Sequence, residues 1–563
     1  MSFAWLTENS RKFLESGYLA EGLSPEVRIR EIADAAEKIL EKKGFADKFY
    51  GYMEEGYYAL SSPVWSNFGN HRGLPISCFG SCIADDMGDI LYTQAEVGMM
   101  SKLGGGTSAY FGNLRPRGAK IRDTWISSGA VHFMQLFENV ISVVSQGSLR
   151  RGHLAAYLPI DHGDAEEFLD IATEGNSIQR LTHAVTVKSD WMESMIDGDD
   201  AKRKLWAKVI QRRGEIGYPY VMFTDNANDN TVDVYKDKKL EILASNMCSE
   251  IMLPSNNRWS FVCCLSSMNL ATYDQWRDTD AVEVMVQFLD AVMEEFITKL
   301  EVYRDSDRKD DQQLFEFMKK SYTFAKENRA LGVGTLGWHS LLQSKKLPFD
   351  GDESHKLNAE IFKLIKERSY KASEELAKEF GEPEILKGYG RRNTTLMAIA
   401  PNTSSAFILG QVSQGIEPFW SNCYVKDVAK LKVTVKNQYL EELLEEKGIN
   451  NREIWTGIRD NDGSVQHLTE ELSDDERERF KTFAEIDQYA IIEQAAVRQH
   501  YIDQGQSLNI MINPKTPVKE INNLYIHAWK LGIKALYYQH SMNAAQELNR
   551  KKSQQDDVCI ACD

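Results

Sequence analysis

The spacing of apolar residues along the chain predicts amphipathic helices that alternate with short, buried strands. One helix is predicted to begin after Ser24, a typical helix cap, with Pro25 at its first position, and to end at Gly44. A longer helix is predicted from Ser354 to Gly381. Between such helices lie the apolar runs YPYVMF, EIMLP, WSFVCCL and TTLMAIAP, which fit buried strands. The alternation is typical of a parallel or mixed α/β architecture.

Composition and charge narrow the class of protein. The 563 residues, 42% hydrophobic and 26% charged, are typical of a globular chain long enough to bury a large core. The net charge, 66 − 83 = −17, argues against a sequence-independent DNA binder. No apolar run approaches the roughly 18 residues of a membrane span, and the first residues lack the layout of a signal peptide. We therefore expect a cytoplasmic chain that binds neither nucleic acid nor membrane.

The end of the chain differs in character from the rest. The acidic segment 460–479 is predicted to be a surface loop with a short capped helix. From about residue 543 the sequence is polar and charged, which predicts a mobile tail. This tail carries a C-x-x-C pair, Cys559 and Cys562, with no further ligands for a zinc site. Eight cysteines are too sparse for a secreted disulfide framework, so the pair indicates thiol chemistry; the alternative is two inert, exposed thiols.

The segment SNMCSEI concentrates polar side chains at alternate positions. Asn246, Cys248 and Glu250 are two residues apart, so on a strand all three would share one face. Burial of such groups is costly unless they are used. A neighbouring carboxylate raises the pKa of a thiol and keeps it protonated, which suits hydrogen-atom chemistry. The alternative is a strand whose polar face meets solvent.

Further cysteines lie in predicted strands. Cys263 and Cys264 are adjacent, so at most one should share a site with Cys248. Cys78 is another candidate, with Cys82 close behind it. The alternative for each is that of a small buried hydrophobe.

Two segments have the character of anion-binding sites, and a third segment indicates electron transfer. Residues 402–405, in APNTSS, follow an apolar run where a helix could begin. Gly104 to Gly106 permit close approach of a ligand to the backbone, and Arg115 and Arg117 follow them. Simple helix caps and glycine turns are the alternatives. The adjacent Tyr537 and Tyr538 fit either packing or an electron relay coupled to proton transfer.

Ten short segments, taken together, resemble the large, catalytic subunit of class I ribonucleoside-diphosphate reductase over nearly the full chain. In order they are SSPVWSNFG, LPISC, the glycine-rich stretch through GAKIR, SQGSLRRG, SNMCSE, CCLSSMNL, PNTSS, GIEP, LYYQ and the C-terminal cysteine pair. The resemblance implies an α/β fold, a ten-stranded α/β barrel made of two five-stranded parallel halves that run antiparallel to each other. It divides the chain into an N-terminal helical segment (1–60), the barrel (61–542) and the flexible tail (543–563), and we expect no helical ATP-cone.

The resemblance also implies a role for each residue of the catalytic site. Cys248 matches the cysteine that becomes a thiyl radical and abstracts the 3′ hydrogen of the substrate ribose. Glu250 matches the base for the 3′ hydroxyl, and Asn246 matches the amide that orients the substrate hydroxyls. Cys78 and Cys263 match the redox pair that reduces the substrate and ends as a disulfide. Cys82, Cys264 and Cys423 match no functional position and are expected to pack in the core.

The radical and the reducing equivalents come from outside the barrel in this family. Tyr537 and Tyr538 match the relay that brings a radical from a metal-containing small subunit, so no covalent cofactor and no metal site are expected in this chain. Cys559 and Cys562 match the tail thiols that reduce the internal disulfide and are themselves reduced by thioredoxin or glutaredoxin.

Nucleotide-binding positions follow from the same resemblance. The substrate set for a nucleoside diphosphate is Ser62, Ser77, Gly106, Asn402, Thr403, Ser404 and Ser405. Asp85 and Arg115 match the effector-binding positions, where a deoxynucleotide or ATP binds at the interface of a homodimer. Residues 173–180 fall where the family has its specificity loop.

Three alternatives remain at this point. An adenosylcobalamin-dependent reductase shares the barrel and the cysteines but does not need Tyr537 and Tyr538. A glycyl-radical reductase would need a glycine-centred ending that this sequence does not show. A catalytically dead nucleotide-binding regulator would not need the retained cysteines and tyrosines.

Overall fold

The computed structural model describes residues 3–71, 73–76, 78–123, 125–144, 152–428 and 431–541. Several segments predicted from the sequence lie outside the described residues. They are Ser77, the SQGSLRRG run up to Arg151, and the tail with Cys559 and Cys562.

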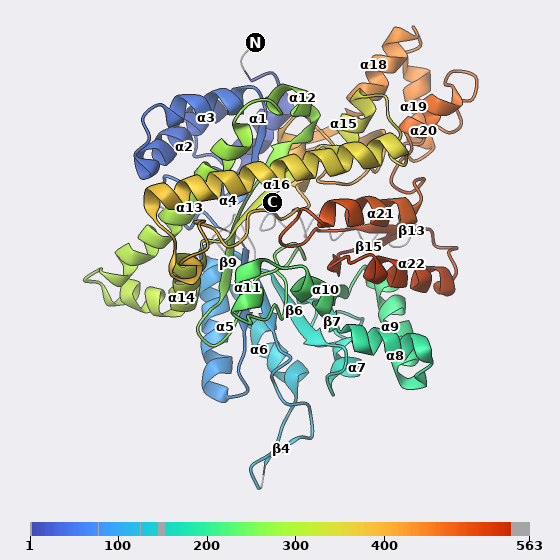
Figure 1. The fold of residues 1–563 in the computed structure, drawn as a ribbon. Helices are drawn as coiled ribbons and strands as arrows, with labels where there is room; N and C mark the ends of the chain where they lie inside the picture. The colour runs from blue at the N-terminus through green and yellow to red at the C-terminus, as the bar shows by residue number, and fades with distance from the viewer. Residues whose placement is uncertain are drawn as a thin grey trace.

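Five parallel strands form the first half of a barrel. They follow one another in the order β2 (Cys78–Cys82), β3 (Gly106–Tyr110), β6 (Leu154–Pro159), β7 (Thr182–Val187) and β8 (Tyr220–Phe223). The elements that connect them are α5 (Met87–Lys102), β4 (Lys120–Ile121), β5 (Trp125–Ile126), α6 (Ala130–Val143), α7 (Ala165–Phe168), α8 (Ser189–Asp197) and α9 (Asp200–Ile216). The helices lie on the outside of these strands (Figure 1).

The second half runs antiparallel to the first and closes the ring. β9 (Phe261–Asn269) pairs antiparallel with β2 and parallel with β10 (Leu331–Leu336). Isolated parallel bridges, Val333 to Met397 and Ile399 to Gln506, continue the ring. β13 (Ile510–Ile512) then pairs parallel with β15 (Gln539–Ser541), and β14 (Ala535–Leu536) pairs antiparallel with β8. The predicted ten-stranded barrel of two parallel halves is confirmed.

Two apolar runs that the sequence assigned to strands make only isolated bridges. In EIMLP, Met252 forms a bridge with Ser245, and the Gly505 N–H donates to the Glu250 carbonyl oxygen at 2.8 Å, so the segment is a short turn that touches the barrel wall rather than a strand of it. TTLMAIAP lies in the barrel wall and pairs with its neighbours through Met397 and Ile399. YPYVMF and WSFVCCL form β8 and β9 as predicted.

Helices at the start of the chain cover one side of the barrel. They are α1 (Glu8–Gly17), α2 (Pro25–Leu40) and α3 (Phe45–Glu54), followed by β1 (Tyr58–Leu60) and α4 (Ser62–Asn67). As predicted, Ser24 caps α2, accepting a hydrogen bond from the Val27 N–H. β1 pairs antiparallel with β9 at the end of the segment that was expected to be helical.

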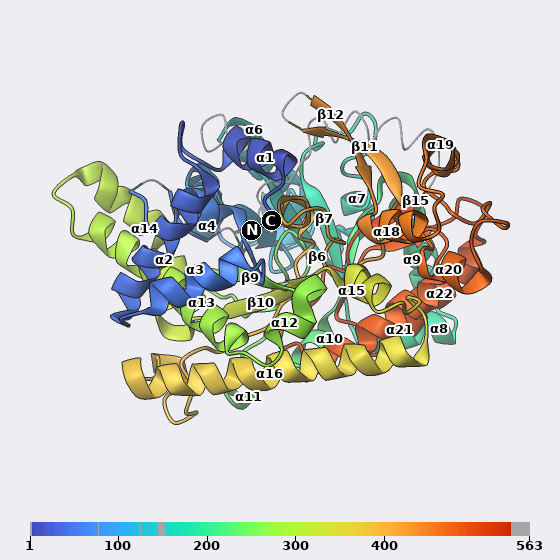
Figure 2. The same cartoon turned by 90° about the horizontal axis from the view of Figure 1, so that it is seen from above.

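The remaining helices follow the first half of the barrel in the chain, and α10 among them still packs on β7 and β8 of that half. They are α10 (Thr224–Asp229), α11 (Asp233–Asp237), η1 (Leu270–Thr272), α12 (Tyr273–Trp276), α13 (Ala281–Arg304), α14 (Lys309–Asn328), α15 (Trp338–Ser344), α16 (Asp352–Phe380), η2 (Glu384–Leu386), α17 (Thr403–Ile408), α21 (Gln488–Gln499) and α22 (Val518–Lys530). The long predicted helix is α16, which crosses the width of the molecule from α13 to α21 (Figure 2). Within the described residues, no helix has the length and apolar character to cross a membrane.

A small unit with its own apolar cluster interrupts the barrel. It contains β11 (Cys423–Val428), β12 (Leu431–Lys436), α18 (Gln438–Glu446), α19 (Arg452–Asp460) and α20 (Asp474–Arg479). The capped helix predicted in segment 460–479 is α20, where Ser473 and Glu476 form a capping box. Cys82, Cys264 and Cys423 are all buried, as expected.

A buried ion cluster joins α13 to the barrel wall. Asp290 is 2% exposed and accepts hydrogen bonds from Arg329, Arg392 and Asn393 at 2.8–3.1 Å. Burial alone would raise the pKa of Asp290, but the two guanidinium groups lower it to about 2. The cluster therefore holds a carboxylate in its charged form.

We expect Asp290→Asn to destabilise the fold by about 3–5 kcal/mol, because it removes the buried counter-charge of two guanidinium groups and leaves them only the exposed Glu294. The apparent thermal midpoint at pH 7 measures this, and Asp278→Asn on the exposed surface is the control. The folded pKa lies below the unfolded value of about 3.9, so this stabilisation is complete above pH 4 and is lost toward pH 2. An unchanged midpoint at pH 7 would contradict the assignment.

Candidate active site

A tight loop inside the barrel carries the central cysteine. Ser245 and Met252 form an antiparallel bridge, and between them the chain turns, with Ser249 at a φ of +67°. The expectation of a strand with three side chains on one face is therefore wrong. Asn246 Oδ1 accepts the backbone N–H groups of Glu250 and Ile251, each at 3.1 Å. An asparagine side chain competes with regular pairing in this way and favours a turn.

The turn nevertheless brings the three predicted polar groups together. Asn246 Nδ2 donates to Glu250 Oε1 at 3.0 Å. The Ser507 hydroxyl lies 3.1 Å from Glu250 Oε2 and 2.6 Å from the Cys248 carbonyl oxygen. Cys248 and Glu250 are fully buried. A buried carboxylate and amide are thus held by hydrogen bonds within the loop that carries Cys248, which offsets the cost of their burial.

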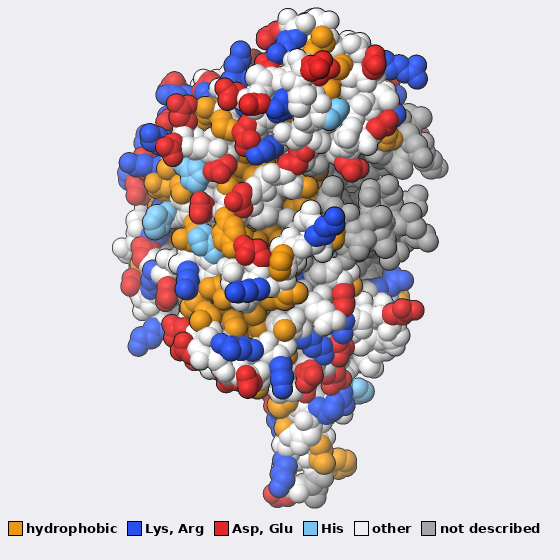
Figure 3. Space-filling model, turned by 90° about the vertical axis from the view of Figure 1, so that its right-hand side faces the viewer, with side chains coloured by type: hydrophobic (Ala, Val, Ile, Leu, Met, Phe, Trp, Pro, Cys, Tyr) orange, Lys and Arg blue, Asp and Glu red, His pale blue; other side chains and the backbone are white. Residues whose placement is uncertain are grey.

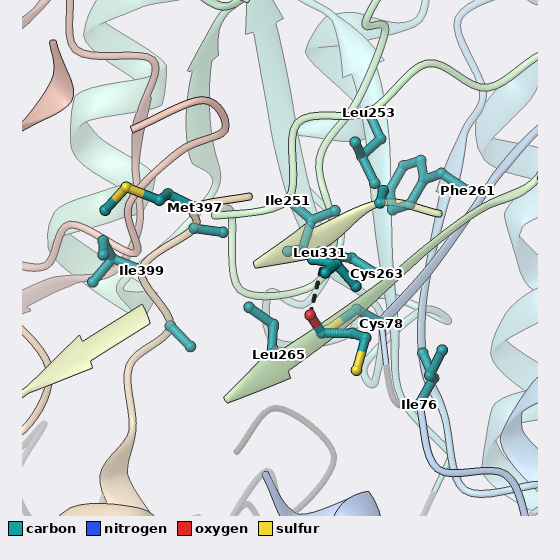
Figure 4. Close-up of a cluster of buried hydrophobic side chains, with 14 of the residues drawn as sticks. Ile76, Cys78, Ile251, Leu253, Phe261, Cys263, Leu265, Leu331, Met397 and Ile399 are labelled. Carbon is teal, nitrogen blue, oxygen red and sulfur yellow. Dashed lines mark hydrogen bonds between the residues drawn. The ribbon is translucent and has the colours of Figure 1, made fainter. Parts of the chain in front are cut away.

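Two further cysteines face each other across β2 and β9. Cys78 and Cys263 are direct partners in the register of these strands (Figure 4). Asn246 Nδ2 lies 3.7 Å from Cys78 Sγ, and Gln504 Nε2 lies 3.5 Å from Cys263 Sγ. Burial raises the pKa of the Cys263 thiol well above its usual value. The register selects Cys263 rather than Cys264, which lies opposite Leu331 of β10.

An aromatic chain runs outward from Cys248. The Tyr537 hydroxyl lies 3.5 Å from Cys248 Sγ. The rings of Tyr537 and Tyr538 are 4.5 Å apart between centroids, and His540 follows Tyr538 at 5.7 Å. Tyr220 of β8 packs against both tyrosines, at 4.7 and 5.1 Å. Tyr537 is 5% exposed and Tyr538 half-buried, so the chain connects the interior to the surface.

The predicted phosphate-binding residues gather where two short helices begin. Ser62 opens α4 and Thr403 opens α17. The Ser405 hydroxyl donates to the Leu60 carbonyl oxygen at 3.5 Å, which joins the two helix starts. The Asn402 side chain donates to Ser267 Oγ and to the Thr335 carbonyl oxygen, so it anchors α17 to the barrel strands. Helix starts of this kind offer backbone N–H groups to an anion.

The remaining substrate positions lie beside the cysteines or in α17. Ser404 is buried in α17, and Gly106 of β3 is the register partner of Cys78. Asp85 and Arg115 follow the carboxyl ends of β2 and β3 and form an ion pair of 2.5 Å. Next to Arg115 the β4–β5 hairpin projects from the body of the molecule (Figures 1 and 3), with Trp125 70% exposed.

Sequence reasoning missed several residues of the site. Gln504 also accepts the Met252 N–H at 3.0 Å, so it connects the loop to Cys263. Asn509 Oδ1 accepts a hydrogen bond from the Tyr538 N–H, and Asn509 Nδ2 donates one to Glu417 Oε1. Burial raises the pKa of Glu417 to about 7. The polar residues of DQGQSLN, ahead of the apolar IMI, were the signal for Gln504, Ser507 and Asn509, and GIEP contains Glu417.

Comparison with known proteins identifies the family. The model of the ribonucleotide reductase barrel domain matches residues 76–202, 200–386 and 383–539. The chain therefore belongs to the ribonucleotide reductase family, which confirms the resemblance read from the sequence. The family and its relatives also confirm the enzyme class predicted from the sequence, an oxidoreductase of deoxyribonucleotide synthesis.

Individual relatives agree with this family assignment, and each is named as a ribonucleotide reductase alpha or large subunit. The class Id ribonucleotide reductase alpha subunit of Actinobacillus ureae superposes with a TM-score of 0.90 at 56% identity, covering 96% of this chain and 98% of that one. The putative ribonucleoside-diphosphate reductase large subunit of Frog virus 3 is 33% identical, covering 92% of this chain and 93% of the relative. The ribonucleoside-diphosphate reductase subunit alpha of Chlamydia trachomatis is 26% identical over 90% of this chain and 55% of its own length.

Proposed function

We propose that this chain is the catalytic subunit of a class I enzyme that reduces ribonucleoside diphosphates to 2′-deoxyribonucleoside diphosphates. The observation that carries the proposal is the position of the Tyr537 hydroxyl, 3.5 Å from Cys248 Sγ, at the inner end of an aromatic chain. An oxidised Tyr537 at this distance can take the hydrogen atom of the Cys248 thiol, which leaves a thiyl radical and restores the phenol.

The groups around Cys248 fit the steps that follow. The thiyl radical abstracts the 3′ hydrogen of the ribose, and Glu250 takes the proton of the 3′ hydroxyl. Asn246 orients the hydroxyl groups. Cys78 and Cys263 supply the two electrons and two hydrogens of the reduction and end as a disulfide, while the 2′ hydroxyl leaves as water. Return of the 3′ hydrogen regenerates the thiyl radical, so one radical serves many turnovers.

In this proposal, substrate and effector bind near opposite ends of strands β2 and β3. The diphosphate lies on the helix starts that carry Ser62 and residues 402–405, with Ser77 and Gly106 nearer the base and the cysteines. A deoxynucleotide or ATP binds at Asp85 and Arg115, at the interface of a homodimer. Bound there, it selects the substrate through residues 173–180.

The proposal requires partners. A metal-containing small subunit supplies the radical to Tyr538, and Tyr538 passes it to Tyr537. The tail thiols Cys559 and Cys562 reduce the Cys78–Cys263 disulfide and are reduced in turn by thioredoxin or glutaredoxin. The similarity to class I alpha subunits supports the small-subunit partner and argues against the cobalamin-dependent alternative. The cytoplasm is the compartment that suits reduced thiols.

The test is reduction of CDP to dCDP by the purified chain with a dithiol and an effector. One reaction contains the metal-loaded small subunit, and the other contains adenosylcobalamin alone. We expect product only in the first. Product with adenosylcobalamin alone would overturn the class I proposal, and product in neither would overturn the activity itself.

A further inference from the structure

A single carboxylate on α6 holds the segment that precedes β7. Glu138 Oε1 accepts the backbone N–H groups of Gln179 and Arg180 at 3.2 and 3.0 Å. Glu138 Oε2 accepts those of Arg180 and Leu181 at 3.1 and 3.0 Å. Three consecutive amides that converge on one anion form a concave backbone site of the kind that binds carboxylate or phosphate. Hydrogen bonds to an ionised acceptor are also about twice as strong as neutral ones.

The held segment is itself compact. The Gln179 side chain donates to the carbonyl oxygens of Thr173 and Asn176, both at 2.7 Å. Ile178, between the amides and this bonded turn, is 1% exposed. Gln135, one turn before Glu138 on the same face of α6, donates to Ser177 Oγ at 3.3 Å. Segment 173–181 is therefore held together by its own hydrogen bonds, and its outer edge rests on α6.

The opposite end of α6 is joined through Asp164 to the segment that carries Arg115. The N–H of Ala130, the first residue of the helix, donates to Asp164 Oδ2 at 2.7 Å. Asp164 Oδ1 accepts the N–H of Arg117 at 2.8 Å, two residues after Arg115. One helix is thus linked through Asp164 to the segment that carries Arg115, and through Glu138 to the proposed specificity loop. A helix transmits an axial shift along its length because its backbone is rigid.

We propose that Glu138 is a positioning residue that couples the effector site to substrate selection, by holding the amides of residues 179–181 in register with α6. The proposal rests on the function proposed above, because it assumes that Asp85 and Arg115 bind the effector. When α6 shifts, the carboxylate carries these amides with it and changes the loop that faces the substrate. The hydrogen bonds need the anion, since a carboxamide offers one acceptor oxygen where the carboxylate offers two.

The test compares Glu138→Gln with Asn139→Ala, the neighbouring position, whose side chain donates to the Gln135 carbonyl oxygen of its own helix. Each variant is assayed with the small subunit on an equimolar mixture of the four ribonucleoside diphosphates, with one deoxynucleoside triphosphate at a time. We expect Glu138→Gln to lower the preference for the effector-favoured substrate about tenfold, within the usual range of coupling between sites. The rate without effector should stay within about twofold of wild type, and Asn139→Ala should keep the wild-type preference.

A second readout separates coupling from mere support of the loop. Hydrogen exchange at the amides of residues 179–181 should become faster in Glu138→Gln. Faster exchange with an unchanged substrate preference would overturn the proposal, because the bonds would then be structural only. If Glu138→Gln does not fold, Glu138→Asp takes its place, and wild-type preference in that shortened variant would count against the proposal. A wild-type enzyme that reduces no diphosphate would instead overturn the proposed function.

Discussion

Cys248→Ser is expected to abolish reduction of ribonucleoside diphosphates and leave nucleotide binding intact. The O–H bond of serine is far stronger than the S–H bond of cysteine, so an oxidised Tyr537 cannot take its hydrogen atom. We expect the rate to fall by more than about a thousandfold, which corresponds to about 4 kcal/mol of additional barrier. Serine differs from cysteine by one atom, an oxygen in place of the sulfur. The loop is held by hydrogen bonds of Asn246 and Ser507 rather than by the thiol. The fold and the phosphate-binding helix starts should therefore be unchanged.

The measurement is product formation in the presence of the small subunit, together with equilibrium binding of CDP. Cys264→Ser is the matched control, because Cys264 is as buried as Cys248 but lies on β9 opposite Leu331 and matches no functional position. We expect this control to retain most of the activity. Turnover by Cys248→Ser at a rate near wild type would refute the role of Cys248, and loss of CDP binding would show that the loop has collapsed.

The sequence predicted those parts of the fold in which local pattern and tertiary packing agree. Helix α2 has its cap at Ser24 and its proline in the first turn, and α16 ends at Gly381 as its pattern indicates. β9 begins with the continuous apolar run FVCCL and is buried on both faces, which is the pattern of a strand in the middle of a sheet. Each of these elements carries its own signal within a few residues.

The catalytic loop shows where local pattern fails. A period of two predicted that Asn246, Cys248 and Glu250 share a face, and they do lie together, but a turn rather than a strand is the cause. The pattern could not distinguish the two, because the decisive contacts come from far along the chain. Ser507 is 257 residues from Glu250, and Gln504 is 241 residues from Cys263. Only the closed barrel brings such residues together.

Tyr537→Phe is the second change with a large expected effect. Phenylalanine keeps the ring that packs 4.5 Å from Tyr538 and 4.7 Å from Tyr220, but it removes the hydroxyl that lies 3.5 Å from Cys248 Sγ. A phenyl ring cannot be oxidised by a tyrosyl radical, nor can it accept the thiol hydrogen. We expect turnover to fall by more than about a thousandfold, with CDP binding and the thermal midpoint unchanged. The assay is dCDP formation with the small subunit.

Tyr220→Phe is the control that gives this result its meaning. Tyr220 packs against both relay tyrosines. Removing its hydroxyl group tests whether radical transfer needs all three phenols of the cluster or only those of Tyr537 and Tyr538. If the hydrogen atom passes directly between Tyr537 and Cys248, Tyr220→Phe should keep activity within about one order of magnitude, since the packing is preserved. If Tyr537→Phe turned over and Tyr220→Phe did not, the radical would reach Cys248 through β8, and the contact between Tyr537 and Cys248 would be packing alone.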